Sequence, residues 1–298
     1  MSFIGIRIAL MIEKKVIEGF FIDRLRNAGL DEPEREFNEL LLHSLNISEL
    51  SIYRADYEIS SSQLNFLAAL VERRVNGEPL QYIIGEVEFY DLKLKVGSGV
   101  LIPRPETELL VEQTVELIKS RIREKNRFFD NFKALDLCTG CGCIALSIAK
   151  AFPLSAVYGV DISQEALEYA KTNRKSNNIT NVVFLQGSLY EPVKAIAFDL
   201  IVSNPPYIKS GDIASLQREI ALYEPHIALD GGADGLDYYN DILDCAKDHL
   251  NDNGMIVLEL GYGLAGKIID IAQMSGFNFI EIHKDYAQID RIAVIGKR

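Results

Sequence analysis

Hydrophobic residues in the first part of the chain recur every three to four positions. The segment 34–45 places its large apolar residues on one helical face. A run of serines at 60–62 offers an N-cap for a further helix over 64–75, and the stretch 46–57 reads as the connection between the two. The pattern predicts a compact helical bundle, which we assign to a separate domain over residues 1–84.

The period changes after residue 84. Residues 85–103 alternate apolar and polar positions as a β-hairpin does, with Tyr90 and Asp91 at its turn, and we treat 85–108 as a linker. A helix is expected over 109–122, where the second domain (109–298) begins. Strand patterns then alternate with helical patterns to the end. The expected strands are Lys133–Leu137, Ala156–Val160, Val182–Gln186, Asp199–Val202, Met255–Leu260, Asn278–His283 and Arg291–Ile295.

Seven strands with intervening helices predict an α/β fold with a doubly wound sheet. The last two strands are too close in sequence for a helix between them, so the final strand should run antiparallel to the others.

Composition limits the partners that this chain can have. The 298 residues carry a net charge of −12, whereas a protein that holds a nucleic-acid backbone needs clustered Lys and Arg, so we expect no direct DNA binding. The apolar start at 3–12 is interrupted by Arg7 and followed by charges, and no apolar run approaches the ~20 residues of a membrane span. We therefore expect a cytoplasmic protein with no membrane contact.

A glycine-rich turn follows the first expected strand of the second domain. The turn Cys138-Thr139-Gly140-Cys141-Gly142-Cys143 leads into a helical pattern, and Asp161 ends the next strand, where it could accept hydrogen bonds from ribose hydroxyls. The glycine-rich turn and Asp161 formally match the pattern of an NAD-binding site. However, Asp136 near the end of the first strand would repel a pyrophosphate and suits a cationic ligand, which favours S-adenosylmethionine.

Three of the four cysteines lie in this turn, which raises the alternative of a metal or iron–sulfur site. Structural zinc sites normally show paired Cys-x-x-Cys or Cys/His groups, and the fourth cysteine, Cys245, is distant. Small residues are also what a cofactor-binding turn requires. We expect no metal.

The stretch Asn204-Pro205-Pro206-Tyr207 carries the most specific chemistry. The two prolines remove two backbone donors and hold the chain extended. The Asn204 side-chain oxygen and the Pro205 carbonyl can accept both protons of an NH2 group on an sp2 carbon, and Tyr207 can stack on its plane. The residues alone do not distinguish a carboxamide from an exocyclic adenine amine.

In this ordered set of motifs the chain resembles the release-factor glutamine N5-methyltransferases, the HemK-like family. The likeness covers about 28–298. Beyond the turn and the Asn-Pro-Pro-Tyr stretch, it rests on Gly77-Glu78-Pro79-Leu80-Gln81-Tyr82-Ile83-Ile84-Gly85, Leu101-Ile102-Pro103-Arg104-Pro105-Glu106-Thr107-Glu108, Tyr223-Glu224-Pro225, Ala228-Leu229-Asp230-Gly231-Gly232-Ala233-Asp234-Gly235-Leu236 and Asp285-Tyr286-Ala287-Gln288-Ile289-Asp290-Arg291.

The resemblance implies a Rossmann-like class I methyltransferase that acts on the glutamine of a Gly-Gly-Gln motif in class I peptide release factors, with the helical domain as a docking module. It implies catalytic roles for Asn204, Pro205 and Tyr207, with Pro206 also in the substrate site. The implied cofactor-binding residues are Asp136, Cys138, Thr139, Gly140, Cys141, Gly142, Asp161, Ser188, Leu189 and Asn204.

Two cofactor-binding segments depart from the family pattern. Cys138 stands where the first glycine of the turn is usual, so we expect an ordinary backbone conformation there. Ser188 and Leu189 replace a more usual acidic–aromatic pair beside the adenine. The sequence leaves open the roles of Arg104, Glu106 and Glu108, which could stabilise the interdomain joint or border the cofactor site. The 223–236 loop could be a flap or an ordinary surface loop.

Three other functions are consistent with parts of the pattern. A ribosomal-protein glutamine methyltransferase would share the catalytic stretch, but the Pro-Arg-Pro-Glu-Thr-Glu segment argues against it. An adenine N6 DNA methyltransferase should show a base-recognition domain and a basic face. A non-enzymatic binding protein would have no need of both an intact Asn-Pro-Pro-Tyr stretch and an intact cofactor turn.

Overall fold

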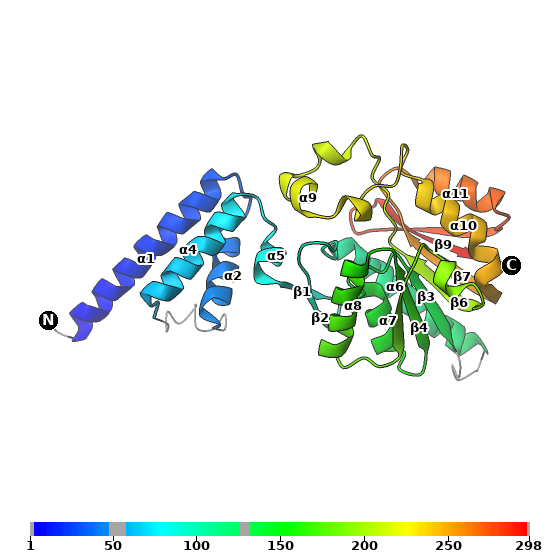
Figure 1. Cartoon of the computed structure of the whole chain (residues 1–298), viewed down its shortest axis with the longest axis horizontal. Coiled ribbons are helices and arrows are strands. Elements are labelled where there is room, and N and C mark those ends of the chain that lie inside the picture. The colour runs from blue at the N-terminus through cyan, green and yellow to red at the C-terminus, as the bar shows by residue number, and fades with distance from the viewer. Residues whose placement is uncertain (1–2, 48–57, 126–131, 297–298) are drawn as a thin grey trace. The chain divides into compact units, whose positions relative to one another are not determined.

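The computed structural model describes residues 3–47, 58–125 and 132–296 of the chain, so most of the connection expected at 46–57 lies outside the described residues. The chain divides into two compact units (Figure 1). The first comprises Met1–Gly85 together with Arg218–Tyr223, and the second comprises Glu86–Gln217 together with Glu224–Arg298.

The first unit is helical. Among its described residues, the helices up to Gly85 are α1 (Phe3–Asn27), α2 (Pro33–Leu45), α4 (Ser61–Val75) and α5 (Leu80–Ile84). The Ser60 side chain accepts from the Gln63 amide and the Gln63 side chain accepts from the Ser60 amide, which satisfies two free donors at the start of α4. Apolar faces meet in a core that includes Leu25, Phe37 and Leu67, all at most 1% exposed.

A short helix far along the chain completes this unit. The guanidinium of Arg74 in α4 is buried, and it contacts Glu219 of α9 (Arg218–Tyr223) at 2.6 Å and Glu36 of α2 at 2.9 Å. The hydroxyl of Tyr223 donates to the carbonyl of Asn76. Burying a charge is costly unless the charge is paired, so the contacts of Arg74 with both acids hold α9 in place.

The second unit begins with the predicted hairpin, β1 (Glu86–Phe89) and β2 (Leu92–Lys95), paired antiparallel. Its main sheet has seven strands in the order β5-β4-β3-β6-β7-β9-β8. They are β3 (Lys133–Leu137), β4 (Ala156–Asp161), β5 (Val182–Gln186), β6 (Phe198–Ser203), β7 (Leu250–Glu259), β8 (Phe279–Lys284) and β9 (Asp290–Gly296). Only β9 runs antiparallel to its neighbours β7 and β8. The expected doubly wound sheet with an antiparallel last strand is therefore confirmed.

Helices cover both faces of this sheet (Figure 1). One group is α6 (Pro105–Lys125), α7 (Cys143–Ala151) and α8 (Gln164–Ser176), and the other is α10 (Asp237–His249) and α11 (Ala265–Met274). Short 3-10 turns lie at Glu191–Val193, Ile213–Ser215 and His226–Ala228. The helix predicted over 109–122 begins earlier, at Pro105, whose ring suits the first turn of a helix. No helix among the described residues is long and apolar enough to cross a membrane.

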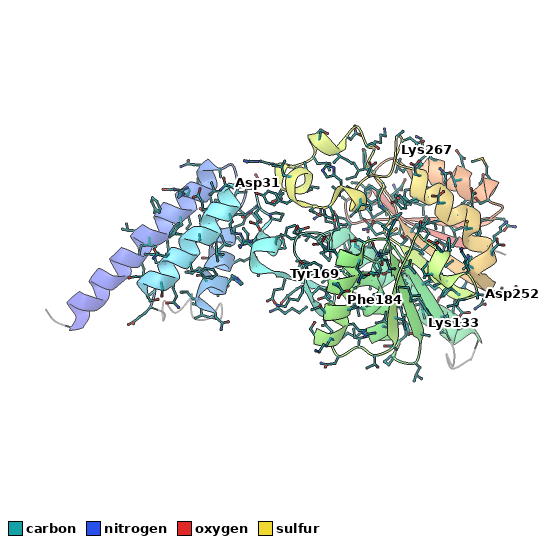
Figure 2. The ribbon with its side chains drawn as sticks, viewed as in Figure 1. Asp31, Lys133, Tyr169, Phe184, Asp252 and Lys267 are labelled. Carbon is teal, nitrogen blue, oxygen red and sulfur yellow. The ribbon has the colours of Figure 1, made fainter. Side chains whose placement is uncertain are left out.

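The sheet register brings three distant positions together. Leu137 in β3 pairs with Val160 in β4 and with Ser203 in β6, so all three strands end at the same edge. Cys138, Asp161 and Asn204 therefore lie side by side there. Lys133 and Asp252, labelled in Figure 2, lie at the opposite, amino-terminal edge.

Candidate active site

A pocket of about 690 Å³, including its open mouth, lies at the carboxyl edge of the sheet. Strand order reverses beside β3, where connections leave in opposite directions, and this is the position at which open α/β sheets bind ligands. Segments after β2, β3, β4, β5 and β6 supply most of its walls. Six of the predicted site residues line it: Cys138, Asp161, Ser188, Leu189, Asn204 and Pro206.

The turn after β3 departs from expectation at its first residue. Cys138 has φ +57°, in the left-handed region, so the prediction of an ordinary backbone there is wrong. Such a conformation costs a residue with a Cβ about 1–2 kcal/mol. The cost is offset because the reversal lets the Thr139 amide donate to the Val160 carbonyl and the Gly140 amide donate to Asp161 Oδ2, at 3.0 and 2.8 Å. The turn is thus fastened to the end of β4.

Asp136 lies beneath this turn and does not line the pocket. It is completely buried, and its Oδ2 accepts from the Thr139 hydroxyl at 2.5 Å and from the Ala145 amide at 3.1 Å. Burial raises the pKa of Asp136 from 3.8 to about 7. Among the described residues, nothing donates to its Oδ1.

The position of Asp136 separates the two candidate cofactors. Its carboxylate occupies the amino end of α7, where a dinucleotide-binding fold would receive the pyrophosphate. A second anion at this point would meet an acid and a helix end that is already capped. The residues present therefore fit a cationic ligand better, and a sulfonium or ammonium nearby would stabilise the ionised carboxylate.

The turn itself offers little direct contact surface. Thr139 and Cys141 are 3% and 2% exposed, and neither they nor Gly140 and Gly142 belong to the pocket lining. The ring of Phe184 lies so close to Gly142 that a Cβ there would stand 2.9 Å from it. The predicted role of these four residues as cofactor contacts stays a prediction.

Asp161 is the carboxylate that faces the pocket. Its Oδ1 accepts from the Ser163 amide and its Oδ2 from the Gly140 amide, and burial raises its pKa. Each carboxylate oxygen has a further lone pair, so both can still accept from ligand hydroxyls. Ser188 and Leu189, after β5, line the same pocket.

The Asn-Pro-Pro-Tyr stretch enters the pocket through alternate residues. Asn204 and Pro206 line it, whereas Pro205 is buried and Tyr207 points elsewhere. Among the described residues nothing donates to the Pro205 carbonyl, which leaves that oxygen available. The ring of Tyr207 packs against Gly261, and its hydroxyl lies 3.4 Å from Glu259 Oε1. Its predicted stacking on a substrate amide stays a prediction.

Two residues that the sequence analysis gave no role lie behind this stretch. The Asn204 Nδ2 group donates to the Thr107 hydroxyl at 3.0 Å, and that hydroxyl donates to Glu259 Oε2 at 2.7 Å. Thr107 and Glu259 are 2% and 1% exposed. The sequence did hold a signal for Glu259, since it is the single acid in an otherwise apolar run, Met255–Leu260.

The segment after α9 supports the Asn-Pro-Pro-Tyr stretch from its other side. The Ile208 amide donates to the Leu229 carbonyl, and the Gly231 amide donates to the Ile208 carbonyl, at 2.9 and 2.8 Å. A Cβ on Gly231 would stand 2.7 Å from the Tyr207 Cα, which explains why glycine is needed for this close approach. The Gly231–Gly232 turn therefore packs against the Asn-Pro-Pro-Tyr stretch.

One ion pair fastens the pocket rim. Arg104 Nη2 contacts Glu224 Oε1 at 2.6 Å, and the Ile102 amide donates to Glu224 Oε2. Because Leu101 and Pro225 line the pocket, the pair ties two of its walls together. This gives Arg104 a place beside the pocket, while Glu106 is exposed and the role of Glu108 stays open.

The clustered cysteines are buried or half-buried. Hydrogen bonding to Cys141, together with burial, raises the pKa of the Cys143 thiol. Within the described parts of the chain, no group of three or more His, Cys, Asp or Glu residues is arranged to hold a metal ion.

Comparison with known proteins identifies the family. Residues 20–85 match the "PrmC N-terminal domain" and residues 111–222 match the "Methyltransferase small domain". A release factor glutamine methyltransferase from Thermodesulfovibrio yellowstonii is 49% identical over 263 residues, which is 88% of this chain and 92% of the relative. The chain belongs to the release factor glutamine methyltransferase family.

Other comparisons agree with this membership. The family's protein from Geobacter sulfurreducens is 38% identical over 90% of this chain and 91% of its own length. Among solved structures, a methyltransferase from Pyrococcus furiosus has a TM-score of 0.50 at 22% identity, covering 70% of this chain and 90% of that one. That likeness concerns the fold alone, and it agrees with the class I methyltransferase architecture.

Proposed function

We propose that this chain methylates the side-chain amide nitrogen of a glutamine, the one in the Gly-Gly-Gln motif of class I peptide release factors, with S-adenosylmethionine as methyl donor. The observation that carries the proposal is the position of Asn204 and Pro206 in the wall of the pocket that Asp161 also lines. It joins a site for an amide and a site for a ribose-bearing cofactor in one cavity. The relatives' name supplies the glutamine and the release factor.

The chain's own residues account for the recognition of an amide. An amide nitrogen is a weak nucleophile because its lone pair is delocalised into the carbonyl. The Asn204 Oδ1 and the Pro205 carbonyl accept hydrogen bonds from its two N–H groups. These hydrogen bonds favour positive charge on the nitrogen as its bond to the methyl carbon forms. Held in this way, the nitrogen is presented to the pocket in a fixed orientation.

The cofactor residues are assigned by chemistry. Asp161 would hold ribose hydroxyls, Leu189 would pack on the base, and Asp136 would favour the cationic end through its charge. When bound, S-adenosylmethionine supplies a methyl group on a positively charged sulfur. A nucleophile can displace the sulfur from this methyl group without a base. We assign the amide proton to solvent, and we propose that no metal takes part.

The helical unit is proposed as the docking module for the release factor. Its family match and its separate core support a role apart from the pocket. We propose that residues 1–84 dock the substrate, that 85–108 form a linker and that 109–298 carry the methyltransferase site. We also propose that the protein is cytoplasmic, because its proposed partner, a release factor, is.

One assay tests this function against its alternatives. Purified protein and labelled S-adenosylmethionine are incubated with four substrates in separate reactions. These are a class I release factor, the same release factor with its Gly-Gly-Gln glutamine replaced by alanine, ribosomal protein, and DNA. Methylation of the first alone, placed on the glutamine by mass spectrometry, supports the proposal. Equal labelling of the alanine variant, or labelling only of ribosomal protein or DNA, would refute it.

A further inference from the structure

The side chain of Asn204 must face the substrate with its oxygen, and a two-residue chain behind it decides this. We infer that Thr107 and Glu259 are positioning residues that turn the Asn204 carboxamide so that its Oδ1 points into the pocket. The inference rests on the proposed amide-methylating function and adds two residues that lie outside the Asn-Pro-Pro-Tyr stretch.

Glu259, the last residue of β7, lies at the far end of this hydrogen-bond network. In its ionised form, above its raised pKa, its carboxylate has only acceptors. Its Oε2 lies 2.7 Å from the Thr107 hydroxyl. A hydroxyl has a single proton, and Thr107 uses it to donate a hydrogen bond to Glu259. Its oxygen can then only accept from a third group.

The third group is the Asn204 carboxamide, 3.0 Å from the Thr107 oxygen. Only the Nδ2 end of an amide can donate to an acceptor. The Nδ2 end is therefore held toward Thr107, and the Oδ1 end is left for the pocket that Asn204 lines. If this orientation were not fixed, the carboxamide could rotate. Its NH2 group would then face the NH2 group of a substrate amide, and two donors cannot form a hydrogen bond with each other.

Several groups surround Glu259 and keep this arrangement in place. The Tyr207 hydroxyl lies 3.4 Å from its other oxygen, and the charge of Arg291 in β9 opposes the effect of burial. Glu106 in α6 acts in the opposite direction. Tyr207 thus belongs to the same network as Asn204, which links both ends of the Asn-Pro-Pro-Tyr stretch to one acid.

The chain provides a matched control for Thr107. Thr114 lies two helical turns further along α6 and is also fully buried, but its hydroxyl donates to the Leu110 carbonyl of the same helix. Thr107→Val and Thr114→Val therefore remove the same hydroxyl from the same helix at equal burial. Only the first removes the acceptor for Asn204.

The test compares steady-state methylation of a release factor by Thr107→Val, Thr107→Ser, Thr114→Val and the unchanged protein, with S-adenosylmethionine binding measured by calorimetry. Since a misdirected acceptor acts on the transition state, we expect kcat of Thr107→Val to fall about 10- to 100-fold, with KM within about threefold. Thr107→Ser keeps the hydroxyl and should recover most of the activity. Binding of S-adenosylmethionine should be the same in all four proteins.

The outcomes separate this inference from the proposed function. If the unchanged protein methylates the release factor and Thr107→Val matches Thr114→Val in kcat, the inference is wrong and the function stands. If Thr107→Ser is as impaired as Thr107→Val, packing rather than the hydroxyl explains the loss, which also overturns it. If the unchanged protein does not methylate any release factor, the proposed function fails first.

Discussion

Burial of the Glu259 carboxylate should make the stability of the second unit depend on pH. Glu259 is 1% exposed, and burial raises its pKa from 4.5 to about 7, although the Thr107 hydroxyl and the charge of Arg291 act in the opposite direction. The folded chain therefore keeps this proton at pH values where the unfolded chain has lost it. The stabilisation is fully present below pH 4.5 and is lost as pH rises through about 7.

The size follows from the two pKa values. A group that titrates at 4.5 when unfolded and at about 7 when folded changes the free energy of unfolding by about 2–3 kcal/mol between pH 5 and pH 8.5. Glu259→Gln carries a neutral amide at every pH and lacks this dependence. The free energy of unfolding of Glu259→Gln, minus that of the unchanged protein, should therefore rise by about 2–3 kcal/mol over this range. Asp136 titrates in the same direction, but it is present in both proteins and cancels.

Urea titrations at several pH values, followed by circular dichroism, measure this difference. Hydrogen exchange of peptides from β6 and β7 identifies the transition that belongs to the sheet. Glu88→Gln, an exposed position in β1, serves as the control and should show no such trend. A difference that stays flat from pH 5 to 8.5, or one that falls, would refute the reasoning about Glu259.

Two further predictions concern the cofactor. Asp161→Ala should weaken S-adenosylmethionine binding by about 1–3 kcal/mol, because it removes charged acceptors from the pocket, whereas NAD should not bind to either protein; unchanged calorimetric affinity would remove the ribose assignment. Purified protein should contain no stoichiometric metal, and treatment with a chelator or the change Cys143→Ala should leave cofactor binding intact; about one zinc or iron per chain by elemental analysis would contradict this.

Much of the fold could be predicted because it depends on patterns of apolar and polar residues that are local in the sequence. The apolar strand runs and the short gap before the last strand predict the sheet and its antiparallel strand, since both depend on hydrophobic period and chain length. The attachment of α9 to the helical unit could not be predicted, because it depends on Arg74 and Glu219, which lie 145 residues apart. No local pattern carries such a contact.

The candidate site shows the same division between local and distant information. Asn204, Pro206 and Asp161 follow predicted strands, so their meeting at one edge followed from parallel pairing. The left-handed backbone at Cys138 was missed because hydrogen bonds from the two following amides outweigh the strain. Thr107 and Glu259 were missed because their role lies in hydrogen bonds to one another and to Asn204, which only the folded chain reveals.

The most direct test of the account is methylation of a release factor by Asn204→Ala. The side chain contributes one prearranged acceptor to the amide, so we expect a fall in kcat on the order of 100- to 1000-fold, with S-adenosylmethionine affinity changed far less. Circular dichroism should show an intact fold. Product formation on the Gly-Gly-Gln glutamine at a rate near that of the unchanged protein would mean that the Asn-Pro-Pro-Tyr stretch is not the active site.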